Sequence, residues 1–143
     1  MRFVDLEPGD ARLTTDVLPV LKGLRPHLTP DDFAAVYAEG HSQGLRFTAV
    51  YDEDSRCVAV AGWRLVATTM ALRKLYVDDL VTAPERRGQG IGAELLGELA
   101  GRARDAHCRV LDLDSGTDRE GAHRFYFREQ MVIRGFHFIR RLA

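Results

Sequence analysis

The chain has 143 residues, of which 45% are hydrophobic and 29% are charged, a composition typical of one soluble globular domain. Its formal net charge of −1 provides no general attraction to nucleic acid or to an anionic membrane surface, so neither is expected as a partner. We find no run of about 18 apolar residues and no signal-peptide pattern. We therefore predict a single domain over residues 1–143, located in the cytoplasm.

The first half of the chain predicts a strand, two helices and a β-hairpin. Thr29 is a good N-cap, and Pro30 after it suits the first helical position. In chain order, we expect a strand at 2–6, a helix ending near 24, a helix from 30, and strands at 47–51 and 57–66 around a turn at 52–55.

The second half alternates strands and helices. We expect a strand at 74–82, a helix at 91–106, a strand at 109–114, a helix at 119–130 and a last strand at 136–142. A helical connection between two neighbouring strands implies a parallel, right-handed crossover. The fold class is therefore α/β, with a mixed, mostly antiparallel sheet flanked by helices.

Cysteine and histidine give no sign of a metal or redox centre. Cys57 and Cys108 each begin a β-like run, and their spacing matches no ligand motif, so we interpret both as buried thiols in a reducing compartment. His123 has no tight cluster of His, Cys or Asp around it in the sequence. We expect no metal.

Three glycines at every second position, Gly88, Gly90 and Gly92, lie between the 74–82 strand and the helix that follows. The first N–H groups of a helix have no intrahelical acceptor and carry partial positive charge. Glycines there let a phosphate approach the backbone without meeting a Cβ atom. The segment therefore predicts a phosphate-binding turn.

Two ligand classes suit such a turn. Gly88, Gly90 and Ala93 formally satisfy a dinucleotide fingerprint, with Asp112 at the distance of a ribose-binding carboxylate. In dinucleotide folds, however, the first glycine follows its strand almost directly, whereas residues 83–87 intervene here. We keep this interpretation as the minor alternative.

The run Arg87-Gly88-Gln89-Gly90-Ile91-Gly92 resembles the Q/R-x-x-G-x-G/A signature of the GNAT N-acetyltransferase family. Residues 60–63 resemble the family's third strand and Phe125-Tyr126 its late helix, so the likeness covers the chain from about residue 45 onward. The resemblance implies acetyl-coenzyme A as donor and central strands, 74–82 and 109–114, that splay apart. It also implies these donor-binding residues: Leu80, Val81, Thr82, Arg87, Gly88, Gln89, Gly90, Ile91, Gly92 and Ala93.

Two catalytic roles follow from the resemblance. Tyr126 matches the family's general acid, which protonates the departing thiolate. Asp78 matches a carboxylate that draws the proton from the incoming amine. By strand alternation we expect Asp78 to share a face with Tyr76, Leu80 and Thr82, and Asp79 to point to the other face. The alternative is that Asp78 or Asp79 is a solvated or ion-paired strand residue.

The resemblance implies an N-acetyltransferase that acts on the primary amine of a small molecule. The alternatives are a protein or peptide N-acetyltransferase and a non-catalytic acyl-coenzyme A sensor. Residues 122–126, with His137 downstream, look most like the aminoalkylphosphonate acetyltransferase branch, although Arg119 stands where many relatives have Asn. Late strands of this family often pair across dimers, so a homodimer is possible.

Overall fold

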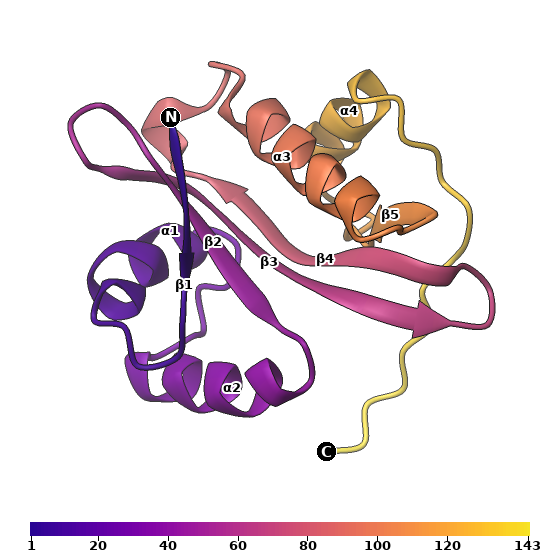
Figure 1. The fold of residues 1–143 in the computed structure, drawn as a ribbon, viewed down its shortest axis with the longest axis horizontal. Helices are drawn as coiled ribbons and strands as arrows, with labels where there is room; N and C mark the ends of the chain where they lie inside the picture. Colours follow the sequence, from indigo (N-terminus) through magenta and orange to yellow (C-terminus); the bar gives the residue numbers. More distant parts are fainter. The chain divides into compact units, whose positions relative to one another are not determined.

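A computed structural model describes all 143 residues (Figure 1). The chain forms two compact units, residues Met1–Asp112 and Leu113–Ala143. The elements are β1 (Arg2–Leu6), a π-helical turn η1 (Leu13–Val17), α1 (Leu18–Leu21), α2 (Pro30–Ser42), β2 (Arg46–Tyr51), β3 (Cys57–Thr68), β4 (Leu72–Thr82), a 3₁₀ turn η2 (Pro84–Arg86), α3 (Ile91–Asp105), β5 (Val110–Leu113) and α4 (Glu120–Arg128). No helix is long and apolar enough to cross a membrane.

The five strands form one sheet in the order β1-β2-β3-β4-β5. The pairs β1–β2, β2–β3 and β3–β4 are antiparallel. The predicted mixed, mostly antiparallel sheet is confirmed. β4 is paired with β3 over ten residue pairs, but the register shifts once, between Gly62 and Trp63 of β3. On either side of that shift, the side chains of β4 alternate between the two faces of the sheet in opposite phase.

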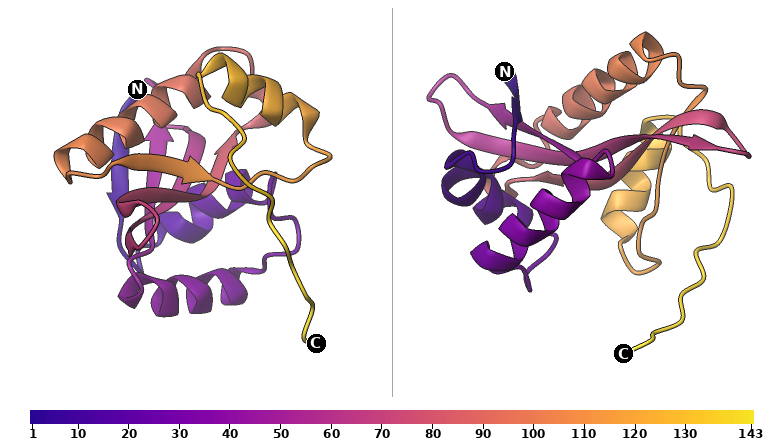
Figure 2. Two further views of the ribbon diagram at one scale, coloured as in Figure 1. Left: turned by 90° about the vertical axis from the view of Figure 1, so that its right-hand side faces the viewer. Right: turned by 60° about the horizontal axis from the view of Figure 1, so that its bottom comes forward.

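Within the first unit, α1 and α2 cover one face of the sheet and α3 covers the other (Figure 2). The face under α1 and α2 carries an apolar core that includes Phe33, Phe47, Val60 and Val81. On α3, the buried residues recur at helical spacing, as expected for one face of a helix packed on a sheet. They are Ile91, Leu95, Leu96, Leu99 and Ala103.

Tyr37 ties α2 to the strands. Its buried hydroxyl donates to the carbonyl of Leu6 at 2.6 Å and accepts from the N–H of Phe47 at 3.2 Å. Both backbone groups lie in strands, so one side chain fixes the helix against β1 and β2. Thr29 caps the same helix by accepting from the N–H of Asp32 at 3.1 Å, with Pro30 at the first helical position, as predicted.

A polar group lies on the opposite face, under α3. The buried Thr48 donates to Asp5 at 2.7 Å and accepts from the indole N–H of Trp63 at 2.9 Å. Arg102 of α3 donates to the same Asp5 carboxylate at 2.7 Å and lies over the Trp63 ring. This cluster joins the C-terminal half of α3 to three strands.

The structure corrects three predictions. The first helix is a π-helical turn followed by the single turn α1, because Pro19 falls inside the predicted helix and favours a new start there. The predicted strand at 136–142 is absent, since no partner strand pairs with those residues. Cys57 and Cys108 are free, as predicted, but only partly buried.

Candidate active site

The turn before α3 has the backbone conformation that the glycines predict. Gly88 and Gly90 have φ angles of 75° and 80°, in the left-handed region. Gly90 is the N-cap of α3, and no side chain caps the helix. Gly92 lies within the first helical turn at an ordinary φ, so only two of the three glycines are needed for backbone freedom.

The space around this turn is open. A Cβ atom built on Gly88 or on Gly90 would meet no other atom within 4 Å. The first N–H groups of a 15-residue helix are therefore uncapped and accessible, which is the arrangement that binds an anion at a helix N-terminus. Arg87 is exposed beside them, whereas Arg86 is partly buried and ion-paired with Asp52 at 2.6 Å.

The pairing of β4 with β3 determines which backbone N–H and C=O groups of β4 are not bonded to β3. The N–H of Ala83 donates to the carbonyl of Val58 at 2.8 Å, so Ala83 belongs to a hydrogen-bonded pair with β3. Such pairs alternate along an antiparallel ladder. The N–H and C=O groups of Leu80 and Thr82 therefore point away from β3, toward the other edge of β4.

A β-bulge at Asp78 changes the predicted side-chain directions. Gly62 lies opposite Asp79 and Trp63 opposite Val77, so Asp78 is an extra residue on β4. Residues that lie opposite each other share a face of the sheet. Asp79 therefore lies on the face of Gly62, under α1 and α2.

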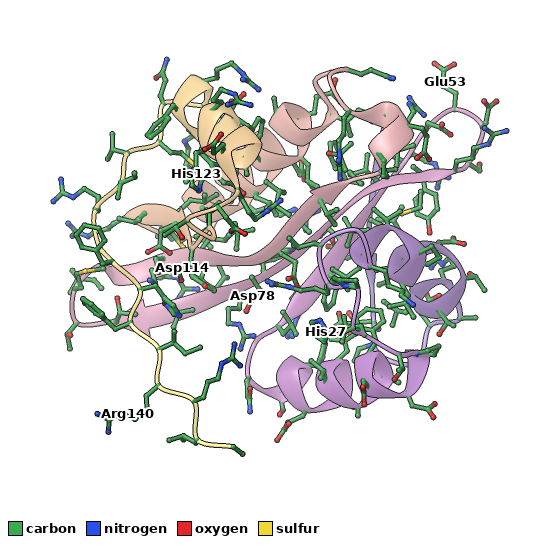
Figure 3. All side chains as sticks on the ribbon, turned by 180° about the vertical axis from the view of Figure 1, so that it is seen from behind. His27, Glu53, Asp78, Asp114, His123 and Arg140 are labelled. Carbon is green, nitrogen blue, oxygen red and sulfur yellow. The ribbon has the colours of Figure 1, made fainter.

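The prediction that Asp78 shares a face with Leu80 and Thr82 is therefore wrong. Asp78, labelled in Figure 3, is bound by Arg64. Arg64 lies opposite Tyr76, on the face under α1 and α2. Leu80 and Thr82 lie opposite Ala61 and Ala59, on the face that α3 covers. The bulge thus places Asp78 and Asp79 on one face.

Two arginines neutralise these two carboxylates. Arg64 binds both oxygens of Asp78, through Nε at 3.0 Å and Nη2 at 2.9 Å. Arg25, in the segment after α1, donates from Nε to Asp79 at 2.8 Å and from Nη2 to the carbonyl of Asp78 at 3.1 Å. Arg25 therefore holds the bulged backbone, and Arg64 holds the Asp78 side chain.

Burial raises the pKa of Asp79, and the attraction of Arg25 opposes that rise without cancelling it. The Asp79 side chain is 14% exposed. Gly62 opposite leaves no room for a side chain, because a Cβ there would come within 2.8 Å of the Phe47 ring and 3.0 Å of the Asp79 carboxylate. Asp79, with a raised pKa, is a better proton acceptor than an ordinary aspartate.

The sequence interpretation missed Asp79, Arg25 and Arg64. Two adjacent aspartates inside a strand were the available signal, because strict alternation would send one of them into an apolar core without a partner. The arginines come from β3 and from a loop about fifty residues upstream, and no local pattern links them to β4.

Tyr126 lies in the second unit, on α4. Burial raises the pKa of its phenol, and the charge of Arg119 opposes that shift. Its ring packs edge-on against Phe125, with 5.3 Å between the ring centroids. On the same helix, His123 is 2.7 Å from the carbonyl of Gly116, so its ring is engaged by the turn before α4.

Asp112, the candidate ribose ligand, is already engaged. Its carboxylate lies 2.8 Å from the ammonium group of Lys74 on β4. Its other oxygen, Oδ1, is buried and has no hydrogen-bond partner. A ribose hydroxyl would have to reach this shielded atom, which weakens the dinucleotide alternative.

Residues 14–130 match the model of the acetyltransferase (GNAT) family. This span is most of the chain and includes the turn before α3, both aspartates and Tyr126. The chain therefore belongs to the GNAT family, whose members use acetyl-coenzyme A as the donor. The match confirms the predicted family and its reaction class, acyl transfer.

Individual relatives resemble parts of the chain or its fold. An aminoalkylphosphonate N-acetyltransferase of Salmonella typhimurium is 38% identical over 66 residues, which are 46% of this chain and 43% of that protein. The chain thus matches less than half of this relative.

Two solved structures have the same fold. A ribosomal-protein-alanine N-acetyltransferase from Brucella melitensis biovar Abortus 2308 has a TM-score of 0.81 at 16% identity, over 99% of this chain and 100% of that one. An aminoglycoside acetyltransferase from an uncultured soil metagenomic sample, solved with trehalose, has a TM-score of 0.79 at 12% identity, over 99% and 96%. At these identities the likeness concerns the fold alone.

Proposed function

We propose that this protein is an N-acetyltransferase that transfers the acetyl group of acetyl-coenzyme A directly to the primary amine of a small molecule. The observation that carries the proposal is the uncapped start of α3, opened by two left-handed glycines. The pyrophosphate of coenzyme A accepts hydrogen bonds from the backbone N–H groups of residues 87–93. Little side-chain chemistry is needed at such a site.

The pantetheine arm extends along β4 in this proposal. The outward N–H and C=O groups of Leu80 and Thr82, with Val81 between them, pair with the pantetheine amides as a further strand would. Support comes from chain order, because β4 leads through η2 into the phosphate turn within a few residues. One ligand can therefore follow the strand edge and end on the helix.

Replacing Gly90 by Asp tests the donor site. Wild-type protein with coenzyme A at about 100 times its dissociation constant should gain roughly 2.7 kcal/mol of stability. In Gly90→Asp this gain should vanish, because a carboxylate stands where the phosphate binds and the φ of 80° disfavours any side chain. Thermal unfolding with and without coenzyme A measures the effect.

Gly97→Asp is the matched control, because Gly97 lies on the exposed side of α3 and a Cβ there meets nothing within 4 Å. It adds the same charge to the same helix and should keep the full stabilisation. Stabilisation by NAD and none by coenzyme A would instead support the dinucleotide alternative.

For the chemistry, we propose that the amine nitrogen attacks the thioester carbonyl and that the C–S bond then breaks. Tyr126 supplies the proton that the departing thiolate needs. The amine loses its own proton to a carboxylate or to water, so that the products are an amide and a free thiol. Binding both substrates together removes much of the entropic cost of the reaction.

Tyr126→Phe should bind coenzyme A normally and lower kcat by about 10²-fold, a typical loss for general acid catalysis. Thiol release from acetyl-coenzyme A across a panel of amines measures it. Tyr51→Phe is the comparison, because it removes a phenol that is bonded to Asp16 in the first unit. Equal turnover in Tyr126→Phe and wild type would remove the assignment.

The amine panel also separates the candidate functions. Turnover with small primary amines, aminoalkylphosphonates among them, supports the proposal. Turnover with peptides alone favours a protein N-acetyltransferase, and coenzyme A binding without any turnover favours the sensor. Aminoalkylphosphonates are included because of the Salmonella relative.

We propose that Asp78 attracts the protonated amine and helps to carry away its proton. An amine with a pKa near about 10 is protonated at neutral pH and must lose a proton before it attacks. Asp79 lies on the same face and has the raised pKa, whereas both oxygens of Asp78 are bound by Arg64. The two positions therefore need to be compared directly.

In Asp78→Asn, the pH profile of kcat/KM should move to higher pH, because the amine then deprotonates without assistance. Asp79→Asn makes the same chemical change one residue later. A profile that shifts in Asp79→Asn and stays in place in Asp78→Asn would transfer the role to Asp79. If both profiles equal that of wild type, water accepts the proton.

We further propose a homodimer in the cytoplasm. The two free thiols suit a reducing compartment. After α4, six large apolar side chains are between 71% and 93% exposed, an unusual cost for a chain alone in water. They are Val132, Ile133, Phe136, Phe138, Ile139 and Leu142.

A second copy that pairs with this segment would cover those side chains. Light scattering should give twice the chain mass for wild type and the chain mass for Phe138→Asp, with unchanged circular dichroism. A monomeric wild type at high concentration would contradict the dimer.

A further inference from the structure

The turn between β2 and β3 reaches the loop before α3 through one ion pair. Asp52 accepts the backbone N–H groups of Asp54 and Arg56 on one oxygen, each at 3.0 Å. Its other oxygen accepts from Nη1 of Arg86 at 2.6 Å. The Asp52 side chain is 10% exposed, so this carboxylate is fixed by its own turn and shielded from water.

Arg86 also binds a residue of the glycine turn. Its Nε donates to the side-chain oxygen of Gln89 at 3.0 Å. Gln89 stands between Gly88 and Gly90, the two residues with left-handed φ. One guanidinium therefore joins a rigid hairpin turn to the middle of the loop.

The other hydrogen bonds of the loop are local backbone ones: the N–H of Arg86 donates to the carbonyl of Ala83 at 2.9 Å, and that of Glu94 to the carbonyl of Gly90 at 3.0 Å. From Pro84 to Gly90, all residues are exposed except Arg86, which is partly buried. The positions around Gly88 and Gly90 have no atom within 4 Å of where a Cβ would lie. Glycines also have the largest backbone freedom of all residues, so such a loop samples many conformations unless it is anchored.

We propose that Asp52 is a positioning residue for the donor: through Arg86 and Gln89 it holds the loop between Gly88 and Gly90 in the conformation that receives the coenzyme A pyrophosphate. The inference rests on the proposed donor site. In this proposal Asp52 does not contact the coenzyme itself, because both of its oxygens are occupied by protein groups. It acts because a loop ordered before binding loses less entropy when the ligand arrives.

The Asp52–Arg86 ion pair also sets the net charge of the loop near the proposed phosphate site. An unpaired Asp52 carboxylate would repel an anion at this end of the loop, whereas Arg86 neutralises it. Arg87 is exposed and forms none of the ion pairs, so in this proposal it is the cation left for the phosphates. The two consecutive arginines thus have different tasks.

Asp52→Asn is the variant that isolates this link. Asn keeps an oxygen for the N–H groups of Asp54 and Arg56, and it turns an NH₂ group toward Arg86 in place of the second oxygen. We expect the dissociation constant for coenzyme A, measured by calorimetry, to rise roughly three- to tenfold, since ordering one loop is the term that is lost. The KM for acetyl-coenzyme A should rise in parallel, with kcat within about twofold of wild type.

Glu53→Gln is the matched control, because it makes the same change in the same turn. Figure 3 shows Glu53 at the tip of the hairpin with its carboxylate directed away from the molecule. Its dissociation constant should equal that of wild type. The unfolding temperature without ligand should be close to wild type in both variants, which separates positioning from loss of fold.

Gln89→Ala breaks the other end of the link and leaves the Asp52–Arg86 pair intact. With Asp52→Asn and the double variant it completes a double-mutant cycle. The double variant should bind coenzyme A about as weakly as the weaker single variant, because either change already releases the loop. Effects that simply add would show that Asp52 and Gln89 act independently and would overturn the inference.

Two further outcomes have distinct meanings. Tighter binding in Asp52→Asn would show that Asp52 withholds Arg86 from the phosphates, which also overturns the inference. Wild-type protein that shows neither heat nor thermal stabilisation with coenzyme A would refute the proposed donor site itself. Binding by wild type and equal binding by Asp52→Asn would refute the positioning role alone.

Discussion

One extra residue on β4 governs the arrangement of the candidate site. Without the bulge at Asp78, strict alternation would put Asp78 and Asp79 on opposite faces of the sheet. With it, both carboxylates lie under α1 and α2. From Leu80 onward the side chains alternate again, but each points to the face opposite to the one that an unbulged strand would give it. The strand therefore presents charge on one face and backbone groups at its edge, a few residues apart.

The bulge brings two negatively charged carboxylates close together, and neighbouring residues neutralise them. Two carboxylates that are close together and shielded from water repel each other strongly. Arg64 from β3 and Arg25 from the segment after α1 each bind one carboxylate, so the group is neutral when all four are ionised. Both carboxylates on this face are therefore already held in place by arginines.

Sequence reasoning succeeded where structure is decided locally. The glycine turn, the Thr29 cap and the strand-to-helix order of residues 72–105 follow from neighbours in the chain, and the structure has them within a few residues. It failed at the bulge, because the extra residue becomes visible only when β3 is paired with β4. It failed again at the last strand, because a β-like pattern such as 136–142 forms a strand only where another strand accepts it.

In the loop before α3, the sequence motif does not include the residue that anchors it. The residues from Arg87 to Gly92 match the family signature, yet the contacts that hold them come from a hairpin turn more than thirty residues earlier. The same holds for β4, where Arg25 and Arg64 determine how the two aspartates are presented. A family signature therefore identifies the family, whereas long-range ion pairs hold the loop and the two aspartates in place.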